Sequence, residues 1–441
     1  MSVRVRFAPS PTGQVHIGNI RAAIFNWLFA RHNGGQFLLR IEDTDRERST
    51  PEAVQTILGA MEWLGLNFDE TPLYQSTQHG RHREAAEKLL AAGRAYKEDK
   101  GGTGQGECII FRMPGTDMGF HDEIKGDLLK KAEDMKDFVI VRSDGSPVFH
   151  LANVVDDITQ GITHIIRGDD HVENTFRHVA LYQALGAPVP RYAHLPMIVN
   201  AQGKPYSKRD GAAYVGQFRD MGYSADALFN YLTLLGWSPG EDREKMTRDE
   251  IIAAFTLDRV KSSPAQMDIR KLTHMNGLYL ADLPLDIFAT GVRRHLIKLD
   301  WGQALDETLF LKVCRLMQSR TPLFVQSESW KYFFVDPLEY DEKAVHKTLR
   351  KEGVKAALET VRDHLAACDF TEAGIQQAIR SSEAALGSGE GKLNQTIRIA
   401  VTGVTTGAGI YETLYVLGRE RSLARFSNTL MTQLEAPHEH T

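Results

Sequence analysis

The stretch Arg4-Val-Arg-Phe-Ala-Pro-Ser-Pro-Thr-Gly-Gln-Val-His-Ile-Gly-Asn-Ile-Arg21 begins with a strand pattern, turns at two prolines and continues as a helix. Apolar residues alternate with arginines up to Phe7, and the prolines end the strand because proline lacks an amide donor. From Ile17 onward apolar residues recur at helical spacing until the stop at residues 34–35. The sequence therefore predicts a βα unit, followed by a second strand over residues 36–41.

This pattern places His16 and Gly18 at the start of the helix. Free amides and the positive end of the helix dipole make such a place attractive to phosphate, and Gly18 has no Cβ to hold a ligand away. The alternative is that His16 is only a capping or surface residue, because no G-x-G-x-x-G or G-K-[ST] signature is present to decide it.

A second polar stretch lies at residues 202–211, Gln-Gly-Lys-Pro-Tyr-Ser-Lys-Arg-Asp-Gly, after a strand-like run at residues 195–199. It carries the adjacent cations Lys208 and Arg209. Cations on a loop suit a triphosphate whose charge shifts during a reaction. The alternative is an ordinary solvated basic loop.

Together the two stretches resemble the paired signatures of class I aminoacyl-tRNA synthetases. Residues 9–19 are similar to the His-Ile-Gly-His region of that class, and residues 205–209 to its Lys-Met-Ser-Lys-Ser loop. Four further segments narrow the resemblance to the glutamyl-tRNA synthetases of the bacterial type, and they are residues 6–13, 40–46, 150–157 and 165–171.

The resemblance implies a Rossmann-type α/β catalytic domain with a parallel sheet, formed by residues 1–85 and 137–240. An α+β insertion for the acceptor end would span about 86–136 and extend as far as 190. Residues 241–310 would contact the tRNA stem, and residues 311–441 would form an all-α anticodon-binding domain. Helical periodicity without competing strand alternation from Phe310 onward agrees with this last expectation.

For glutamate, the resemblance implies that Arg6 and Arg167 bind the two carboxylates. Arginine suits this task because its planar fork binds a carboxylate by two parallel hydrogen bonds and stays charged. Glu42 would bind the ammonium group. The rest of the pocket wall is expected from Ala8, Ser10, Asn153 and Phe149, the last of which stands where several relatives have a tyrosine.

For ATP, the resemblance implies catalytic roles for His16, Gly18, Lys208 and Arg209, with Ser207 also in the ATP site. Magnesium would accompany ATP as part of the substrate complex. Pro205 stands where many relatives have the first lysine of the loop, and Lys204 is the hypothetical replacement.

Composition limits the partners and the compartment. A chain of 441 residues suggests two to four domains, and its net charge of −5 means that any tRNA surface is a local basic patch. The three cysteines lie far apart, which argues against a disulfide framework and a zinc site. We expect a cytoplasmic monomer that acts on tRNA(Glu), possibly also on tRNA(Gln), without a membrane partner and without bound metal.

Four further predictions concern local structure. Thr50 and Thr247 should cap helices. Residues 138–141 and 147–149 should form a hairpin. The acidic pairs at residues 156–157 and 169–170 should lie at strand ends, where such pairs often cap the next helix, and residues 97–106 should lack regular structure.

Three other functions compete with this prediction. A relative that glutamylates a queuosine base in tRNA shares the catalytic half but lacks a helical anticodon domain. Glutaminyl-tRNA synthetases have a C-terminal half built from β-barrels. A catalytically silent RNA- or nucleotide-binding module is the third, motivated by Pro205 and by the short insertion.

Overall fold

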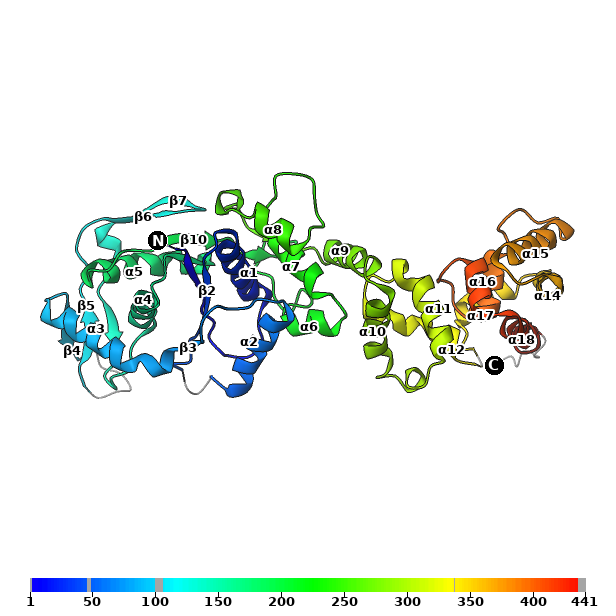
Figure 1. Cartoon of the computed structure of the whole chain (residues 1–441), viewed down its shortest axis with the longest axis horizontal. Helices are drawn as coiled ribbons and strands as arrows, with labels where there is room; N and C mark the ends of the chain where they lie inside the picture. Colours follow the sequence, from blue (N-terminus) through cyan, green and yellow to red (C-terminus); the bar gives the residue numbers. More distant parts are fainter. Residues whose placement is uncertain (1, 46–48, 100–105, 337, 435–441) are drawn as a thin grey trace. The chain divides into compact units, whose positions relative to one another are not determined.

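The computed structural model describes residues 2–45, 49–99, 106–336 and 338–434. The chain folds into two compact units, Met1–Met275 (unit 1) and Asn276–Thr441 (unit 2), and each is described by itself (Figure 1). The division falls inside α9, Ile269–Ala281, within the stretch that the sequence set apart as residues 241–310. In the described part of the chain, no helix is both long and apolar enough to cross a membrane.

Unit 1 has the alternating strands and helices of an α/β domain. Its strands are β1 Arg4–Phe7, β2 Gln36–Ile41, β3 Leu73–Tyr74, β4 Ala95–Glu98, β5 Cys108–Phe111, β6 Met118–Asp122, β7 Gly126–Lys130, β8 Phe138–Val141, β9 His164–Gly168, β10 Arg191–Leu195, β11 Ile198–Val199 and β12 Ala265–Gln266. Its helices are α1 Ile17–His32, α2 Pro51–Trp63, α3 His79–Ala91, α4 Phe149–Thr159, α5 Val172–Ala184, α6 Val215–Asp220, α7 Ala225–Leu234 and α8 Arg248–Ala254.

The parallel strands of unit 1 run beside α1. The order β1-β2-β3 is parallel throughout, and β9, β10 and β6 are parallel in a second sheet that β7 extends by antiparallel pairing. Thr163 donates its amide to the carbonyl of Arg4, which joins the start of β9 to β1. The carboxyl ends of β1 and β9 therefore lie together, and open α/β sheets bind their ligands at such ends.

The predicted βα unit is confirmed. The strand ends at Phe7, the helix begins at Ile17, and the second strand covers Gln36–Ile41. The predicted caps are also present, because the Thr50 side chain accepts from Ala53 N and Thr247 forms a capping box with Glu250. These features depend on short-range sequence, and local propensity was sufficient for them.

One local prediction was right in part, and two were wrong. The predicted hairpin is present, because Val141 and Pro147 form an antiparallel bridge and Val148 N donates to the carbonyl of Ile140, but its second arm ends before Phe149, which begins α4. The pair Asp156 and Asp157 lies inside α4 and is buried. Asn153, Asp156 and Asp157 recur at helical spacing, but every residue from 151 to 157 is buried, so this polar face of the helix lies inside the protein and not toward solvent. Residues 97–98 belong to β4, while residues 100–105 lie outside the described part.

Unit 2 is helical in its described residues, as predicted. Its longer helices are α10 Leu285–Leu296, α11 Glu307–Met317, α14 Val354–Ala367, α15 Glu372–Ala385, α16 Asn394–Thr402, α17 Ile410–Leu417 and α18 Arg419–Thr429, with the short helices α12 Lys331–Phe334 and α13 Glu342–Ala344. Apolar residues of these helices pack into one core that extends from Leu280 to Leu430.

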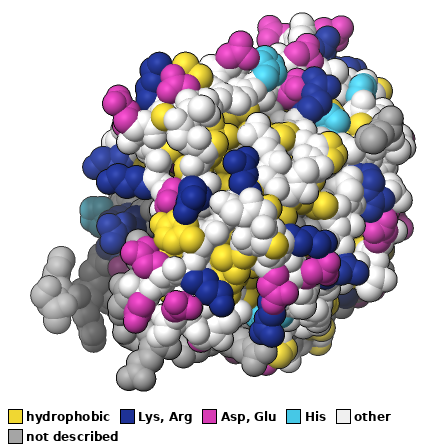
Figure 2. Space-filling model, turned by 90° about the vertical axis from the view of Figure 1, so that its left-hand side faces the viewer, with side chains coloured by type: hydrophobic (Ala, Val, Ile, Leu, Met, Phe, Trp, Pro, Cys, Tyr) yellow, Lys and Arg dark blue, Asp and Glu magenta, His cyan; other side chains and the backbone are white. Residues whose placement is uncertain are grey.

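The molecular surface mixes both signs of charge. Figure 2 shows one face of the molecule, on which Lys and Arg side chains are interspersed with Asp and Glu, and hydrophobic side chains show between them. Together with the net charge of −5, this mixture gives no uniform attraction to a polyanion on that face.

Candidate active site

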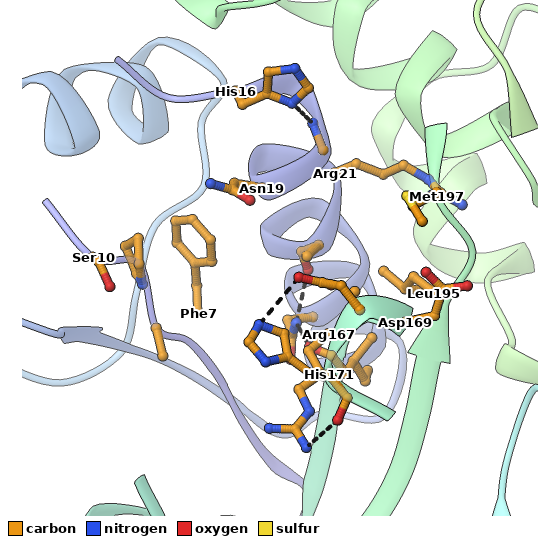
Figure 3. A pocket seen from close by; sticks show the side chains of 18 of the residues that line it. Phe7, Ser10, His16, Asn19, Arg21, Arg167, Asp169, His171, Leu195 and Met197 are labelled. Carbon is orange, nitrogen blue, oxygen red and sulfur yellow. Dashed lines mark hydrogen bonds and ion pairs between the residues drawn. The ribbon is translucent and has the colours of Figure 1, made fainter. Parts of the chain in front are cut away.

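A cavity of about 470 Å³ opens at the carboxyl ends of β1 and β9. It is lined by residues between 6 and 12, the first turns of α1, the start of α4, residues 166–171 and residues 195–198, with Pro205 and Tyr206 from the second polar stretch. Figure 3 shows His16 at the start of α1, with Arg167 and His171 farther along the cavity and Arg21 beside Met197.

The cavity brings together most of the residues that the sequence singled out. The ones that line it are Arg6, Ala8, Ser10, His16, Gly18, Glu42, Phe149, Asn153 and Arg167. Ser207, Lys208 and Arg209 are not among the lining residues, and neither is Lys204. The structure thus assembles the predicted glutamate residues and the helix start in one place, and it leaves the loop cations outside the cavity.

His16 caps α1 and contacts the second polar stretch. Its Nδ1 accepts from Gly18 N at 3.1 Å. Its ring lies edge-on to Tyr214, with 5.9 Å between the ring centroids. Burial lowers the pKa of His16, and a hydrogen bond with the backbone of Tyr206 opposes that shift. The neutral imidazole is therefore favoured near pH 7 in the structure without nucleotide.

The expectation of free amides at the start of α1 needs correction. Ile17 N donates to the carbonyl of Ala213 at 2.9 Å, and Gly18 N donates to the side chain of His16. Because capping and the neighbouring strand segment occupy these two donors, they are not available to a phosphate unless those bonds open. A Cβ on Gly18 would stand 3.3 Å from Nδ1 of His16, so the absent side chain leaves room for this cap.

Two buried arginines and two buried carboxylates form a network at one end of the cavity. Arg6 Nε donates to Asp157 Oδ1 at 3.0 Å, and Arg40 Nη1 donates to the same oxygen at 2.5 Å. Arg40 Nη2 donates to Asn153 Oδ1 at 2.7 Å and to Glu42 Oε1 at 3.3 Å. Burial would raise the pKa of Asp157, but the charges of Arg40 and Arg6 hold it below its usual value.

Arg6 keeps part of its guanidinium for the cavity. Only Nε has a hydrogen-bond partner among the described residues, and the side chain is 4% exposed. Glu42 also lines the cavity, and burial raises the pKa of its carboxyl group more than Arg40 and Arg6 lower it. An ammonium group placed beside Glu42 would favour the charged carboxylate.

Arg167 is a buried cation whose hydrogen-bond partners among the described residues are all neutral. Its Nη2 donates to Thr175 Oγ1 at 2.7 Å, and its Nε donates to His194 Nε2 at 3.3 Å. Within the described ranges no carboxylate lies within 4 Å of this guanidinium, which is the limit for an ion pair. Burial lowers the pKa of Arg167, so an anion that entered the cavity would relieve a real desolvation cost.

The remaining nitrogen of Arg167 faces another donor. Arg177 Nη1 can only donate, so His150 accepts at Nε2 across 3.2 Å and carries its hydrogen on Nδ1. That hydrogen points to His178 Nε2 at 3.2 Å. Neutral His178 then carries its hydrogen on Nδ1, 3.5 Å from Arg167 Nη1. Two donors cannot bond each other, so Nη1 has no acceptor among the described residues and can take one from a ligand.

Burial keeps both of these histidines neutral. It lowers the pKa of His178 well below the usual value and lowers the pKa of His150 to about 4, and nearby arginines act in the same direction. The described residues contain no group of three or more His, Cys, Asp and Glu side chains arranged to hold a metal ion.

Backbone hydrogen bonds hold the second polar stretch at Tyr206, and hold the chain beyond its end at Ala213 and Val215. Tyr206 N donates to the carbonyl of Ile198 at 2.9 Å, and Val215 N donates to the carbonyl of Val15 at 3.0 Å. Within the loop, Asp210 accepts from both the amide and the hydroxyl of Ser207. Lys208 and its neighbour at position 209 are exposed at the tip.

Sequence reasoning missed several residues of this site. Arg40 and Asp157 hold the glutamate-side network, and Asp122 and His194 lie behind Arg167. Arg21 lines the cavity as a buried cation whose Nε and Nη2 have no hydrogen-bond partner in the part of the chain that the structure describes, and burial lowers its pKa to about 10. Arg40 and Asp157 belong to the segments that carried the resemblance, whereas Asp122 and His194 are marked by no pattern in the sequence.

The chain matches two families in the same order as its units. Residues 2–103 and 98–274 match the catalytic domain of the class I tRNA synthetases (E and Q). Residues 287–430 match an anticodon-binding domain. This second match covers most of the helical unit.

Curated relatives match over nearly the whole chain. A glutamate–tRNA ligase of Xanthomonas euvesicatoria pv. vesicatoria is 43% identical, and the alignment covers 98% of this chain and 99% of the relative. A glutamate–tRNA ligase of Legionella pneumophila is 39% identical, with 98% of each chain covered. Glutamate–tRNA ligase 1 of Caldanaerobacter subterraneus subsp. tengcongensis is 37% identical, with 97% of each chain covered.

Solved structures agree with this similarity. A glutamate tRNA ligase from Elizabethkingia meningosepticum, in complex with its amino acid, superposes with a TM-score of 0.88 at 28% identity. The glutamate-tRNA synthetase of Elizabethkingia anophelis superposes with a TM-score of 0.86, also at 28% identity. Each comparison covers 98% of this chain and 100% of the other.

Proposed function

The chain belongs to the glutamate–tRNA ligases, class I tRNA synthetases that carry an anticodon-binding domain and use ATP to attach glutamate to tRNA(Glu), and we propose that the cavity of unit 1 is where its glutamate is bound and activated. The observation that carries this proposal is the pair of buried arginines, Arg6 and Arg167, each of which keeps donor groups for the cavity.

In the proposed complex each arginine takes one carboxylate of glutamate. The ammonium group lies beside Glu42, and Asn153 orients that carboxylate because its Nδ2 donates to Glu42 Oε1 at 3.0 Å. Ala8, Ser10 and Phe149 complete the wall. Glutamine has no charge on its side chain and would leave a buried arginine unpaired, which costs about 2 to 5 kcal/mol. Selection against the amide then follows without editing.

In the activation step, the α-carboxylate of glutamate attacks the α-phosphorus of ATP. A new O–P bond forms, the bond to the bridging oxygen breaks, and pyrophosphate leaves. The protein aligns the reactants and balances the charge that grows on the phosphates. His16 and Gly18 serve the phosphates at the start of α1 once the hydrogen bond between the Gly18 amide and His16 Nδ1 opens, and Ser207, Lys208 and Arg209 approach from the loop. The terminal hydroxyl of tRNA then attacks the mixed anhydride, and AMP leaves.

This division of roles requires the loop to approach the cavity, because its cations are not among the lining residues. Pro205 and Tyr206 already line the cavity, so the tip begins next to it. The charge of ATP supplies the attraction between Lys208 and the phosphates.

We further propose magnesium as the partner of ATP and no zinc requirement, a cytoplasmic monomer, and charging of tRNA(Glu), with tRNA(Gln) as the candidate second substrate. The cysteines at positions 108, 314 and 368 are all free, which suits a reducing compartment.

A direct experiment is aminoacylation of the two purified tRNA species with labelled glutamate and with labelled glutamine. The proposal expects glutamate to be attached to tRNA(Glu) and glutamine to be rejected. Arg6→Gln and Arg167→Gln should each raise the KM for glutamate, whereas a KM that neither substitution changes would exclude this cavity as the glutamate site.

A further inference from the structure

Behind Arg167 lies a fully buried, hydrogen-bonded carboxylate–imidazole pair that the activation chemistry does not use. Asp122 Oδ2 accepts from His194 Nδ1 at 2.6 Å, and both side chains are 0% exposed. His194 Nε2 lies 3.3 Å from Nε of Arg167. The three residues therefore form a line from a carboxylate, through an imidazole, to a guanidinium.

The hydrogen positions along this line follow from the donors. The carboxylate of Asp122 already accepts from the amides of Ile124 and Lys125, and it also accepts from the amide of His194. A carboxylate held by so many donors stays ionised, so the hydrogen of neutral His194 lies on Nδ1. Its Nε2 then offers a lone pair to the N–H of Arg167.

We propose that Asp122 and His194 are positioning residues for glutamate binding: they orient the guanidinium of Arg167 so that its Nη1 edge faces the incoming carboxylate. The inference rests on the proposed role of Arg167 in the glutamate site. Thr175 fixes the second edge of the guanidinium through Nη2, at 2.7 Å.

The imidazole between the two charges has a physical purpose. A carboxylate in direct contact with Arg167 would neutralise it and repel a substrate that is itself a dianion through its carboxylates. With one ring interposed, Asp122 polarises His194 and offsets part of the desolvation cost of the cation. Arg167 still lacks a direct anionic partner among the described residues, and the substrate supplies one.

Asp122 ends β6, one strand of the β6–β7 ribbon at residues 118–130. The ribbon reaches the cavity at a second point, because Lys125 Nζ lies 3.0 Å from Oδ2 of Asp169, which lines the cavity. The ribbon belongs to the segment that the sequence set apart as an insertion. This geometry makes the ribbon part of the amino-acid site and not only an appendage of it.

Two substitutions of His194 separate its hydrogen bond with Asp122 from its hydrogen bond with Arg167. His194→Asn keeps an N–H near the place of Nδ1, for Asp122, and removes the acceptor for Arg167. His194→Gln puts a carbonyl oxygen near the place of Nε2 and keeps that acceptor. Residues that support metal ligands from behind change affinity or activity by about 10- to 100-fold, and we expect the same order for a residue that supports Arg167. We expect His194→Asn to raise the KM for glutamate by about 10-fold or more, with kcat at saturating glutamate within about threefold of the parent.

His194→Gln should recover most of that loss, and Asp122→Asn should raise the KM for glutamate without lowering kcat in proportion. Glu123→Gln is the matched control, because it breaks an ion pair with Arg191 on the same ribbon without touching the ring. It should leave both constants unchanged. All variants are assayed as full-length enzyme with saturating ATP and tRNA(Glu), and thermal unfolding shows which of them fold.

Equal KM values for His194→Asn and His194→Gln, or a loss confined to kcat, would overturn the inference. If His194→Asn does not fold, Asp122→Asn decides by the same KM-against-kcat split. Arg167→Gln in the same assay separates failure of this inference from failure of the proposed glutamate site. A raised KM for Arg167→Gln with a normal KM for the ring variants removes only this inference, whereas a normal KM for Arg167→Gln removes the proposed site itself.

Discussion

Nε of Arg6 donates a hydrogen bond to Oδ1 of Asp157 across 3.0 Å, although 151 residues separate the two in the chain. The two side chains are only 4% and 2% exposed. Asp157 also bonds Arg40, so one carboxylate holds two buried cations. The proposed glutamate side of the cavity therefore depends on a helix residue that is not among the lining residues.

Replacement of Asp157 by asparagine should destabilise the enzyme. The substitution leaves two buried guanidinium groups without their shared charge, and loss of one partner of a buried pair costs about 3 to 5 kcal/mol. Denaturant unfolding followed by circular dichroism measures this loss. Asp220→Asn removes the carboxylate of an exposed pair with Arg219 and should change the free energy of unfolding by less than about 1 kcal/mol. Similar losses for the two variants would show that Asp157 is not a structural centre.

The two proposed carboxylate ligands should act on substrate binding. Arg6→Gln or Arg167→Gln removes a buried charge that faces the carboxylate, and such truncations cost about 2 to 5 kcal/mol, which is roughly a 30-fold or larger rise in the KM for glutamate. Glutamate titrations at saturating ATP and tRNA(Glu) give this constant. The KM for ATP serves as the internal control and should change much less.

Lys208 should act on the phosphates and not on the amino acid. Lys208→Ala is expected to lower the rate of glutamate activation by about 100-fold or more, because it removes a charge that stabilises the leaving pyrophosphate. Its effect on glutamate binding should be small. Lys88, an exposed helical lysine paired with Glu84, offers a control substitution without effect. Equal losses in both constants would indicate a structural role for Lys208.

Substitution of Lys204 tests whether this residue replaces the lysine that many relatives have at the position of Pro205. If Lys204 replaces the missing lysine of the loop, Lys204→Ala lowers the activation rate measured by pyrophosphate exchange in the presence of tRNA. Lys204 is exposed and its amide donates to Asn200 Oδ1, so removal of the side chain leaves that turn intact. An unchanged exchange rate would remove Lys204 from the site.

Acidification should destabilise the enzyme through its buried histidines. Burial lowers the pKa of His150 to about 4, against about 6.5 in the unfolded chain, so between these values the unfolded state binds more protons. Stability from this residue is complete above about pH 6.5 and falls as the pH drops toward 4. His150→Gln should give a shallower fall of the unfolding temperature from pH 7.5 to pH 4.5.

The control for this pH effect is His121→Gln. A hydrogen bond with Asp127 raises the pKa of exposed His121, so this residue adds stability at low pH and its replacement cannot flatten the fall. A profile for His150→Gln that parallels the parent would contradict the assignment of a neutral buried imidazole.

Phe149 offers a test by gain of function. The ring lies against His171 with 5.8 Å between centroids and lines the cavity. A tyrosine hydroxyl at this position would add one hydrogen bond, worth about 0.5 to 1.5 kcal/mol, so Phe149→Tyr should lower the KM for glutamate by roughly 2- to 12-fold. A raised KM would show that the wall has no room for the hydroxyl.

The strand, turn and helix at the N-terminus could be predicted because each depends on neighbours within a few residues. Prolines end β1, and glycines follow α1. The threonine caps of α2 and α8 have the same local origin. The resemblance then supplied the residues of the pocket wall, and the structure brings them to one cavity.

The supporting residues could not be predicted, because their partners are distant in the chain. The sequence predicted that Asp157 caps a helix, and its contact with Arg6 depends on how α4 packs against β1. Asp122 and His194 are 72 residues apart, and their side chains meet because β6 pairs with β10. The tautomers of His150 and His178 can be assigned only when all their hydrogen-bond partners are known. The availability of Arg167 Nη1 for a ligand depends on that assignment.

The backbone hydrogen bonds on either side of the polar loop limit how far Lys208 can move. Backbone hydrogen bonds hold the chain at Tyr206 and again at Ala213, which leaves six residues, 207–212, between them. Six extended residues measure about 20 Å, and a path that goes out and returns halves this to about 10 Å. The carbonyl of Ala213 accepts from the first amide of α1. A movement of the loop that displaces Ala213 therefore also acts on the start of α1, beside the proposed phosphate site. The length of the segment between Tyr206 and Ala213, more than its flexibility, therefore determines which phosphate oxygen Lys208 contacts.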